Sequence, residues 1–428
     1  MYNIVIYLYL LGVAICSLFN DKVRRMWRGE RDAFRVLREQ VDPEARYVWF
    51  HAASLGEFEQ GRPLMEELRR RRPDLKILLT FFSPSGYEVR KNYEGADIIC
   101  YLPLDTIRNA RRFLRLIRPE MAFFIKYEFW YNYLHILKHR GVPTYSVSSI
   151  FRDGQVFFRW YGHQYGRVLK CFTHFFVQNE KSRELLASIG LTNVSITGDT
   201  RFDRVLQIKE QARQLPVVEQ FIEDSKGKVF VAGSSWPPDE EIFIKYFKAH
   251  PEWKLIIAPH VIGEDHLQQI EKALGEGKAV RYSSVERRTE NGEFATARKE
   301  APLGAVGGAS TSASALIIDC FGLLSSIYRY ADVCYVGGGF GVSVHNTLEA
   351  AVWGKPVIFG PNNHKFQEVQ ELKGCEGGFE IASYDDFARL MDRFEREPDF
   401  LAKASAEAGS YVQGRAGATN KILSDVGF

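Results

Sequence analysis

The chain of 428 residues is long enough for two domains of ordinary size. Its composition, 46% hydrophobic and 25% charged, is that of a folded globular protein and excludes a disordered one. A formal net charge of +3 indicates no nucleic-acid partner. The six cysteines are scattered and include no C-x-x-C pair, which indicates reduced thiols in a cytoplasmic environment and no zinc site.

The chain begins with an apolar segment. Residues 1–19 are apolar except for Asn3 and Ser17, and as a helix they would span roughly 28 Å, about the thickness of a bilayer core. Basic residues follow this segment between positions 22 and 31, whereas a cleaved signal peptide carries them before it. We therefore predict a membrane anchor over residues 1–20, with the rest of the chain on the cytoplasmic face of the inner (plasma) membrane and in contact with inner-membrane lipid. A buried N-terminal helix is the alternative.

From residue 46 strands and helices alternate, which is typical of a parallel, doubly wound sheet. Residues 21–207 are predicted to form one domain, with strands expected at 47–51, 76–82, 97–102, 121–125, 144–147 and 174–177. After a linker at 208–227, a second domain at 228–397 is expected to have strands at 228–233, 254–259, 315–319, 332–336 and 357–360. Residues 283–312 lack periodicity and are predicted to be a flexible surface insertion. A C-terminal helix within 398–428 is expected to cross back to the first domain.

The predicted fold class is α/β: two Rossmann-like domains facing a cleft, with an N-terminal membrane-anchor helix. In open α/β sheets, ligands bind outside the carboxyl ends of the strands. The residues that directly follow predicted strands are therefore the candidate site residues.

The first such segment is His51-Ala52-Ala53-Ser54-Leu55-Gly56-Glu57-Phe58. Ser54 and Glu57 have the spacing of a capping box, which is one interpretation. The other places Ser54, Gly56 and Glu57 at a strand-to-helix corner, where the Glu57 carboxylate removes a proton from an acceptor hydroxyl as general base. The spacing alone leaves both open.

Charged residues follow two later strands of the first domain. Lys126 and Glu128 come after the strand at 121–125 and must face a ligand or each other, because an unpaired buried charge is costly. Arg201, just before the linker, can clamp a carboxylate or phosphate with two hydrogen bonds. A surface pair between Arg201 and Asp203 is the alternative, and the spacing alone favours it.

Small and polar residues follow three strands of the second domain. Ser234 and Ser235 precede prolines and acids that are typical of a helix start, so they either bind phosphate or cap the helix. The positions at the next two strand ends, where a base and ribose would rest in this fold, are Pro259, His260, Phe321, Gly322 and Leu323.

The most informative segment runs from Ser343 to Ala351, behind a glycine cluster at 337–341 and before a strand at 357–360. Strand, glycine turn, helix start and strand are typical of a nucleotide site, where free N–H groups of a helix N-terminus meet a phosphate. We assign recognition chiefly to Asn346 and Glu349, because a Glu in the first turn can accept hydrogen bonds from ribose hydroxyls. A crowded turn in an α/β protein is the alternative, and the glycines are expected to serve close backbone packing.

At these residues the chain resembles the Kdo transferases, which move 3-deoxy-D-manno-octulosonic acid (Kdo) from CMP-Kdo to a lipid A precursor. The resemblance lies in the H-x-x-S-x-G-E corner at 51–57, the E-[LF]-W segment at 128–130 and the H-N-x-L-E-A-A segment at 345–351. It implies the glycosyltransferase B arrangement, a CMP-Kdo donor, a lipid A precursor acceptor, and neither a metal nor another cofactor.

Carried over by residue, the resemblance implies that Glu57 is the catalytic base and that Arg201 stabilises the transition state. Where the family commonly has an acid, this chain has Lys126, which we predict supplies positive charge; where it has Pro-Arg-His, this chain has Pro259-His260-Val261. The donor-binding positions are Ser234, Ser235, Pro259, His260, Phe321, Gly322, Leu323, His345, Asn346, Thr347, Leu348 and Glu349. On the acceptor side we place Ser54, Gly56 and Glu128.

Two other functions fit the same fold. One is a sugar-nucleotide epimerase, which needs no acceptor. The other is a non-catalytic nucleotide- or lipid-binding relative, supported only by the departures at Lys126 and His260.

Overall fold

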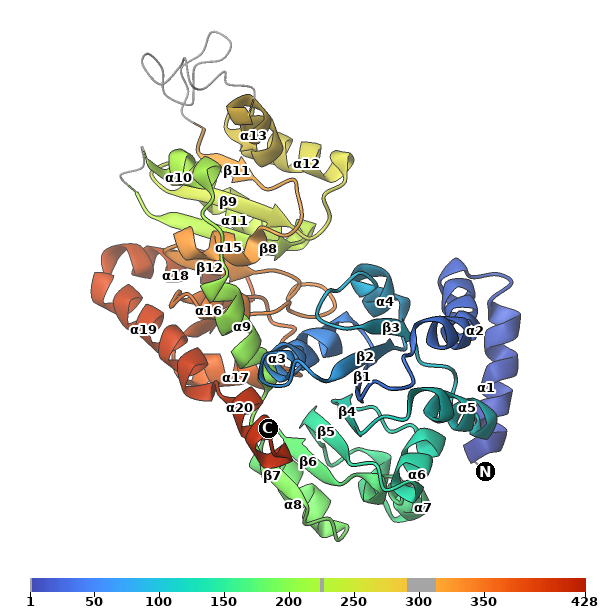
Figure 1. The fold of residues 1–428 in the computed structure, drawn as a ribbon. Helices are drawn as coiled ribbons and strands as arrows, with labels where there is room; N and C mark the ends of the chain where they lie inside the picture. Colours follow the sequence, from blue (N-terminus) through green and yellow to red (C-terminus); the bar gives the residue numbers. More distant parts are fainter. Residues whose placement is uncertain (1, 224–226, 291–312) are drawn as a thin grey trace. The chain divides into compact units, whose positions relative to one another are not determined.

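The computed structural model describes residues 2–223, 227–290 and 313–428. They divide into two compact units: residues 1–204 with 415–428 form unit 1, and residues 205–414 form unit 2. Each unit is built on a seven-stranded sheet in which every pairing is parallel (Figure 1). The predicted fold class is therefore confirmed as two parallel-sheet α/β units.

The sheet of unit 1 has the order β3-β2-β1-β4-β5-β6-β7. Its strands are β1 (Tyr47–Ala52), β2 (Lys76–Phe81), β3 (Ile98–Tyr101), β4 (Met121–Ile125), β5 (Thr144–Ser149), β6 (His174–Val177) and β7 (Val194–Ile196). Its helices are α1 (Tyr2–Cys16), α2 (Asp21–Gln40), α3 (Leu55–Arg71), α4 (Pro84–Arg90), α5 (Ile107–Ile117), α6 (Tyr131–His139), α7 (His163–Gly166), α8 (Glu180–Ser188), the start of α9 (Thr200–Glu210) and α20 (Ala418–Val426).

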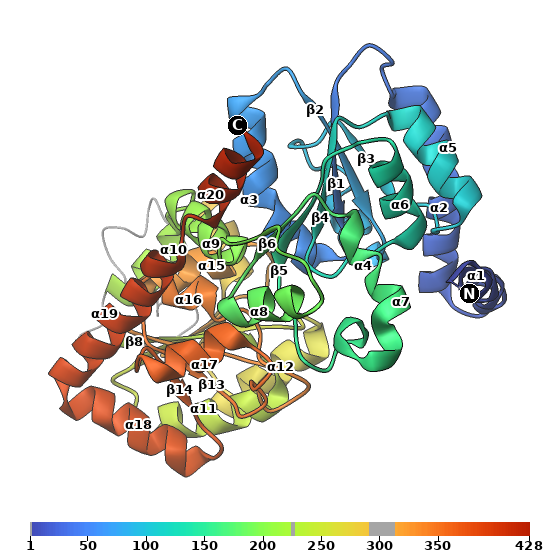
Figure 2. The ribbon, with the colours of Figure 1, turned by 90° about the horizontal axis from the view of Figure 1, so that it is seen from below.

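Both faces of this sheet are covered. One face packs against α2, α5 and α6 through Trp49, Phe113 and Tyr133, while the other packs against α3 and α20 through Phe50, Phe58 and Ile422. Figure 2 shows α20 beside α3 on one side of β1 and β2, with α5 and α6 on the other. Because both faces are buried, the strands read as continuous apolar runs, which is why the sequence located them.

The sheet of unit 2 has the order β10-β11-β9-β8-β12-β13-β14. Its strands are β8 (Val229–Ser235), β9 (Lys254–Pro259), β10 (Ala279–Arg281), β11 (Ala315–Ile317), β12 (Val333–Val336), β13 (Val357–Phe359) and β14 (Gly378–Glu380). Its helices are the end of α9, α10 (Pro216–Glu223), α11 (Pro237–Ala249), α12 (Glu264–Leu274), α13 (Tyr282–Glu290), α15 (Leu324–Ile327), α16 (Leu348–Ala351), α17 (Gln367–Gly374), α18 (Tyr384–Arg396) and α19 (Pro398–Arg415).

Several boundaries differ from the predictions. The expected C-terminal helix is two helices, α19 and α20, because Gly417 adopts a left-handed conformation with φ 101°. The segment predicted as a linker contains α10, whose Val217, Val218 and Phe221 are buried. Of the predicted insertion at 283–312, residues up to Glu290 belong to α13 and residues 291–312 lie outside the described part.

The predicted membrane-spanning anchor is not found. Within the described residues no helix combines the length and the apolar character needed to cross a bilayer. Helix α1 has 15 residues and is about 22 Å long, short of a bilayer core of about 30 Å. Instead, Ile6 and Val13 are buried and the Tyr2 hydroxyl donates to Asp105 at 2.7 Å, so α1 is packed on unit 1.

Candidate functional site

The candidate residues of unit 1 lie where the strand order reverses. Strand β1 pairs with β2 on one side and β4 on the other, so the carboxyl ends of β1 and β4 form the switch point at which ligands bind in such sheets. The segment from Ser54 to Glu57 follows β1, and the segment from Lys126 to Glu128 follows β4.

The corner after β1 is not a capping box. Ser54 occupies the N-cap position of α3 in an extended conformation, but its side chain accepts no hydrogen bond from the helix backbone. Its hydroxyl instead donates to the carboxylate of Glu57. Both side chains are half-buried, so the pair holds a carboxylate in a defined orientation at the helix start.

Within the described residues, Glu128 has partners other than Lys126. The Glu128 carboxylate accepts a hydrogen bond from the Trp130 indole at 2.7 Å and lies 3.1 Å from Nε2 of the buried His51. The Lys126 ammonium lies 5.4 Å from the centre of the Tyr127 ring. Lys126 also has φ 67°, a conformation that costs a residue with a side chain about 1–2 kcal/mol.

Arg201 is held by a residue that the sequence did not single out. Asp199 is 5% exposed and accepts from the Arg201 backbone N–H and Nε, each at 2.9 Å, and from Gln60 Nε2 at 2.9 Å. Burial alone would raise the pKa of Asp199, but the charge and hydrogen bonds of Arg201 hold it below its usual value. The alternative partner, Asp203, instead accepts hydrogen bonds from Gly417 and Thr419 at the start of α20.

Tyr127 lies within electrostatic range of Glu57, Asp199 and Arg201. Its hydroxyl is buried and makes no hydrogen bond within the described residues. Burial raises its pKa; the charge of Arg201 acts to lower it, while Glu57 and Asp199 raise it further. Glu57, Tyr127 and Arg201 therefore share one neighbourhood of unit 1.

The candidate residues of unit 2 also lie at a switch point, because β8 pairs with β9 on one side and β12 on the other. Neither predicted serine caps α11, because the N-cap residue is Trp236. Ser234 adopts φ 53° at an irregularity in the β8–β9 pairing, and the buried Ser235 donates to Glu240 at 2.8 Å.

Asp239 connects the start of α11 to the loop after β12 in unit 2. From the sequence it was identified only as an acid in the first helical turn. Its buried carboxylate accepts from Trp236 N at 2.9 Å, Tyr335 Oη at 2.7 Å and Gly338 N at 3.0 Å. These contacts join α11 to the loop after β12. A Cβ on Gly337 or Gly339 would meet backbone atoms within 2.7 Å, so these glycines permit close backbone packing, as expected.

Three aromatic rings stack beside this loop. The His260 ring lies 4.7 Å from Trp236 and 4.4 Å from His345, and the Trp236 indole donates to His345 Nε2 at 3.1 Å. Burial and the neighbouring His260 lower the pKa of His345, so Nε2 remains an acceptor at neutral pH. Phe321 is 78% exposed on the turn after β11, beside Gly322 with φ 89° and Leu323 at the N-cap position of α15.

The segment predicted to bind the nucleotide has an internal network. Asn346 accepts from Leu348 N at 3.2 Å and donates to Glu349 at 3.0 Å, and Ser325 donates to Glu349 at 2.7 Å. Thr347 and Leu348 are fully buried, and α16 has only four residues. Asn346 is exposed and Glu349 is half-buried, so both polar side chains are accessible to a ligand.

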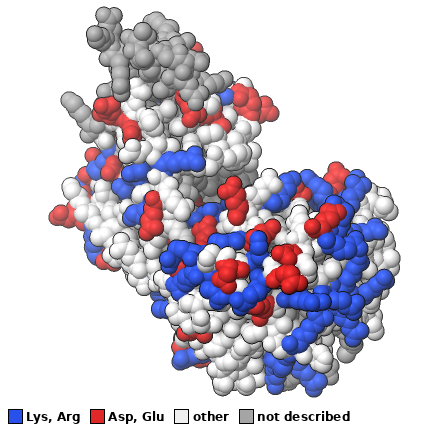
Figure 3. Space-filling view, viewed as in Figure 1, with Lys and Arg blue, Asp and Glu red and all other residues white. Residues whose placement is uncertain are grey.

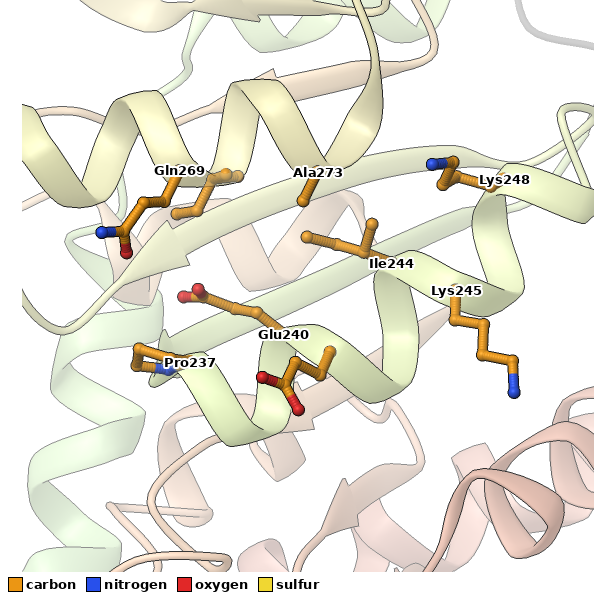
Figure 4. Close-up of a pocket in the computed structure, with 9 residues that line it drawn as sticks. Pro237, Glu240, Ile244, Lys245, Lys248, Gln269 and Ala273 are labelled. Carbon is orange, nitrogen blue, oxygen red and sulfur yellow. The ribbon is translucent and has the colours of Figure 1, made fainter.

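A cavity of about 510 Å³ lies between α11 and α12, and Glu240 and Gln269 line it (Figure 4). The residues that line this cavity belong to α11 and α12, not to the strand ends. Glu240 connects it to the candidate edge, because the same carboxylate binds Ser235 and lies 2.8 Å from His266 Nε2.

The sequence matches a known family and several relatives that carry the name of that family. Residues 28–204 match the family described as 3-deoxy-D-manno-octulosonic-acid transferase (kdotransferase). A 3-deoxy-D-manno-octulosonic acid transferase of Aquifex aeolicus is 29% identical over 86% of this chain and 92% of its own length. The transferase of Bordetella pertussis is 26% identical over 89% of this chain and 87% of its own length.

Solved structures share the fold at low identity. The UDP-GlcNAc 2-epimerase of Neisseria meningitidis superposes with a TM-score of 0.58 and 15% identity, over 89% of this chain and 99% of that one. Anabaena Alr3699/HepE superposes with a TM-score of 0.54 and 9% identity, over 89% and 99% of the two chains. At these identities the likeness concerns the fold alone. Residues 28–204 thus match the 3-deoxy-D-manno-octulosonic acid transferases, and relatives with that name, which are glycosyltransferases, are similar to most of the chain.

Proposed function

We propose that the protein transfers Kdo from CMP-Kdo to a hydroxyl of a lipid A precursor, without a metal and with inversion at the anomeric carbon. The observation that carries this proposal is the Glu57 carboxylate, which Ser54 orients at the switch point of unit 1. A carboxylate at this position can remove the proton of an attacking hydroxyl. With one general base and no protein nucleophile, the acceptor hydroxyl attacks the anomeric carbon directly in a single displacement, which inverts its configuration.

The nucleotide is assigned to unit 2. Asn346 and Glu349 offer an amide and a carboxylate suited to ribose hydroxyls, and the exposed ring of Phe321 offers a surface for a base. CMP leaves as an anion, and we assign the stabilisation of developing negative charge to Arg201 and Lys126. Arg201 suits this role because Asp199 fixes its guanidinium through Nε and Nη2.

Membrane association is assigned to α1 and α2. The apolar side chains of Ile4, Leu8, Leu11 and Ile15 are between 53% and 65% exposed, while the opposite stripe of α1 packs on unit 1. Lys and Arg side chains form a band over α2 and α5 (Figure 3). An apolar helix face beside basic residues is typical of a helix that lies in the membrane interface. We place this surface on the inner leaflet of the inner membrane.

The test is Glu57→Gln, assayed with CMP-Kdo and tetra-acylated lipid A precursor by mass of the lipid product. We expect transfer to fall about 10²–10⁴-fold, since the amide cannot accept the proton, while CMP binding persists. Wild-type turnover would contradict the role of Glu57. Consumption of donor without acceptor, in the wild-type protein, would favour the epimerase alternative.

A further inference from the structure

A cavity of about 240 Å³ in unit 1 lies outside the candidate catalytic corner. It is formed by α2, α4 and β3, and its lining includes Arg25, Arg28, Tyr87, Glu88 and Tyr101. Drug-sized ligands occupy pockets of about 300–1,000 Å³, so this cavity suits a smaller group.

Tyr101, one of the residues that line the cavity, carries a hydrogen-bond donor without a partner among the described residues. Tyr101 is 2% exposed, and its hydroxyl makes no hydrogen bond within the described residues. A buried polar group without a partner destabilises the protein, and a hydrogen bond to a ligand oxygen would offset this cost. Gly29 gives the Tyr101 ring room to lie against α2, since a Cβ there would come within 2.2 Å of the ring. The ring also packs against Tyr87, whose ring centre is 4.3 Å away.

The charges around the cavity leave two cations available. The acids Asp32 and Glu88 each have a basic partner, Arg35 at 4.0 Å and Lys91 at 3.3 Å. Among the described residues, Arg25 and Arg28 form neither an ion pair nor a hydrogen bond, and both are exposed. Burial raises the pKa of the nearby Glu30 to about 8, so this carboxyl adds little negative charge at neutral pH.

The position of the cavity relates it to the membrane surface. Tyr101 packs in one apolar cluster with Val13 of α1 and Met26 of α2. Helix α4, which supplies Tyr87 and Glu88, also abuts the candidate corner, because a Cβ on Gly86 would lie 3.1 Å from the Ser54 carbonyl carbon.

We propose that this cavity binds the phosphomonoester of a membrane-lipid head group, with Arg25, Arg28 and Tyr101 as donors. A phosphomonoester is favoured over a diester because it carries more charge and three terminal oxygens, which match two guanidinium groups and one hydroxyl. The lipid source rests on the membrane association proposed above.

The test is binding of the full-length protein to phosphatidylcholine vesicles that contain phosphatidic acid, compared with phosphatidylglycerol at equal surface charge. We expect several-fold tighter binding to phosphatidic acid, a loss of this preference in Arg25→Gln/Arg28→Gln, and a partial loss in Tyr101→Phe. The matched control is Arg31→Gln/Arg38→Gln, which removes the same charge from α2 outside the cavity lining and should keep the preference.

Equal binding to the two vesicle types, or equal losses in the two double variants, would overturn the site and leave only general charge attraction. Glycerol 3-phosphate competes with the vesicles if the site is correct, but binding it as tightly as the phosphatidic acid vesicles would overturn the lipid source. The vesicle-binding measurement uses neither CMP-Kdo nor catalytic turnover. A negative result would therefore not contradict the proposed transferase reaction. Conversely, wild-type turnover in Glu57→Gln would not affect the vesicle preference.

Discussion

The Ser54 hydroxyl donates its hydrogen bond to the Glu57 carboxylate and leaves the backbone of α3 uncapped by a side chain. A residue pair with capping-box spacing has thus been turned into a donor–carboxylate pair. The hydroxyl of Ser54 therefore orients the carboxylate that we propose as the catalytic base. It does not stabilise the N-terminus of α3 as a cap would.

Ser54→Ala should therefore behave unlike the loss of a helix cap. We expect its free energy of unfolding to change by less than about 0.5 kcal/mol, while kcat falls roughly 3–10-fold because the carboxylate loses an orienting hydrogen bond. The matched control is Ser83→Ala, since Ser83 accepts from Ser85 N at the start of α4 and its loss should cost about 1 kcal/mol. Urea unfolding and initial rates check both. Equal losses of stability would contradict this reading of Ser54.

Asp199→Asn should weaken both unit 1 and transfer. The amide keeps the shape of Asp199 but removes the charge facing Arg201, and we expect a loss of about 2–3 kcal/mol, below that of a fully buried pair because Arg201 is 25% exposed. Because the folded pKa of Asp199 is lowered, its contribution is present above its unfolded pKa and is lost as pH falls through the folded value. The free energy of unfolding of the wild-type protein and of Asp199→Asn is measured at pH 7 and at pH 3. The difference between the two proteins should be smaller at pH 3.

The loop after β12 offers a glycine comparison. Gly338 has φ 91°, and a Cβ there would meet Ser343 O at 2.5 Å and His345 Cδ2 at 2.9 Å, whereas at Gly341 the nearest atom is 3.5 Å away. Gly338→Ala should lower the free energy of unfolding by about 2–3 kcal/mol and weaken CMP binding. Gly341→Ala should leave the stability and the CMP affinity unchanged. Calorimetric CMP titration and thermal unfolding distinguish them. CMP affinity unchanged in Gly338→Ala would show that this loop does not hold the nucleotide.

His345 should titrate below the usual range of histidine. Its folded pKa is lowered, so the free energy of unfolding is unaffected by this group above about pH 6.5 and decreases as pH falls from there toward the folded pKa. Trp236→Phe removes the indole donor to Nε2 and should raise the pKa of His345, whereas Trp353→Phe, which loses a bond to Ser325 O, should leave it unchanged. Proton NMR of the imidazole resonances checks this. An unaltered titration in Trp236→Phe would exclude control by the indole.

The sequence located the longer strands because strands buried on both faces are continuous apolar runs. It missed the edge strands β7, β10 and β14, each of three residues and only partly buried, because so short a segment has no detectable period. It placed candidate residues at strand ends, since that position depends only on where the apolar runs stop.

By itself, the sequence determined the two α/β sheets and the resemblance to the Kdo transferases, because apolar periodicity and short motifs are local properties. The tertiary structure decided the partners: Asp199 for Arg201, His51 for Glu128, and Asp239 for the loop after β12. The last two of these contacts join residues 77 and 99 positions apart, so no local spacing could predict them. It also decided which side chains of α1 are buried, Ile6 and Val13, because Val13 packs with Met26 and Tyr101, which lie elsewhere in the sequence.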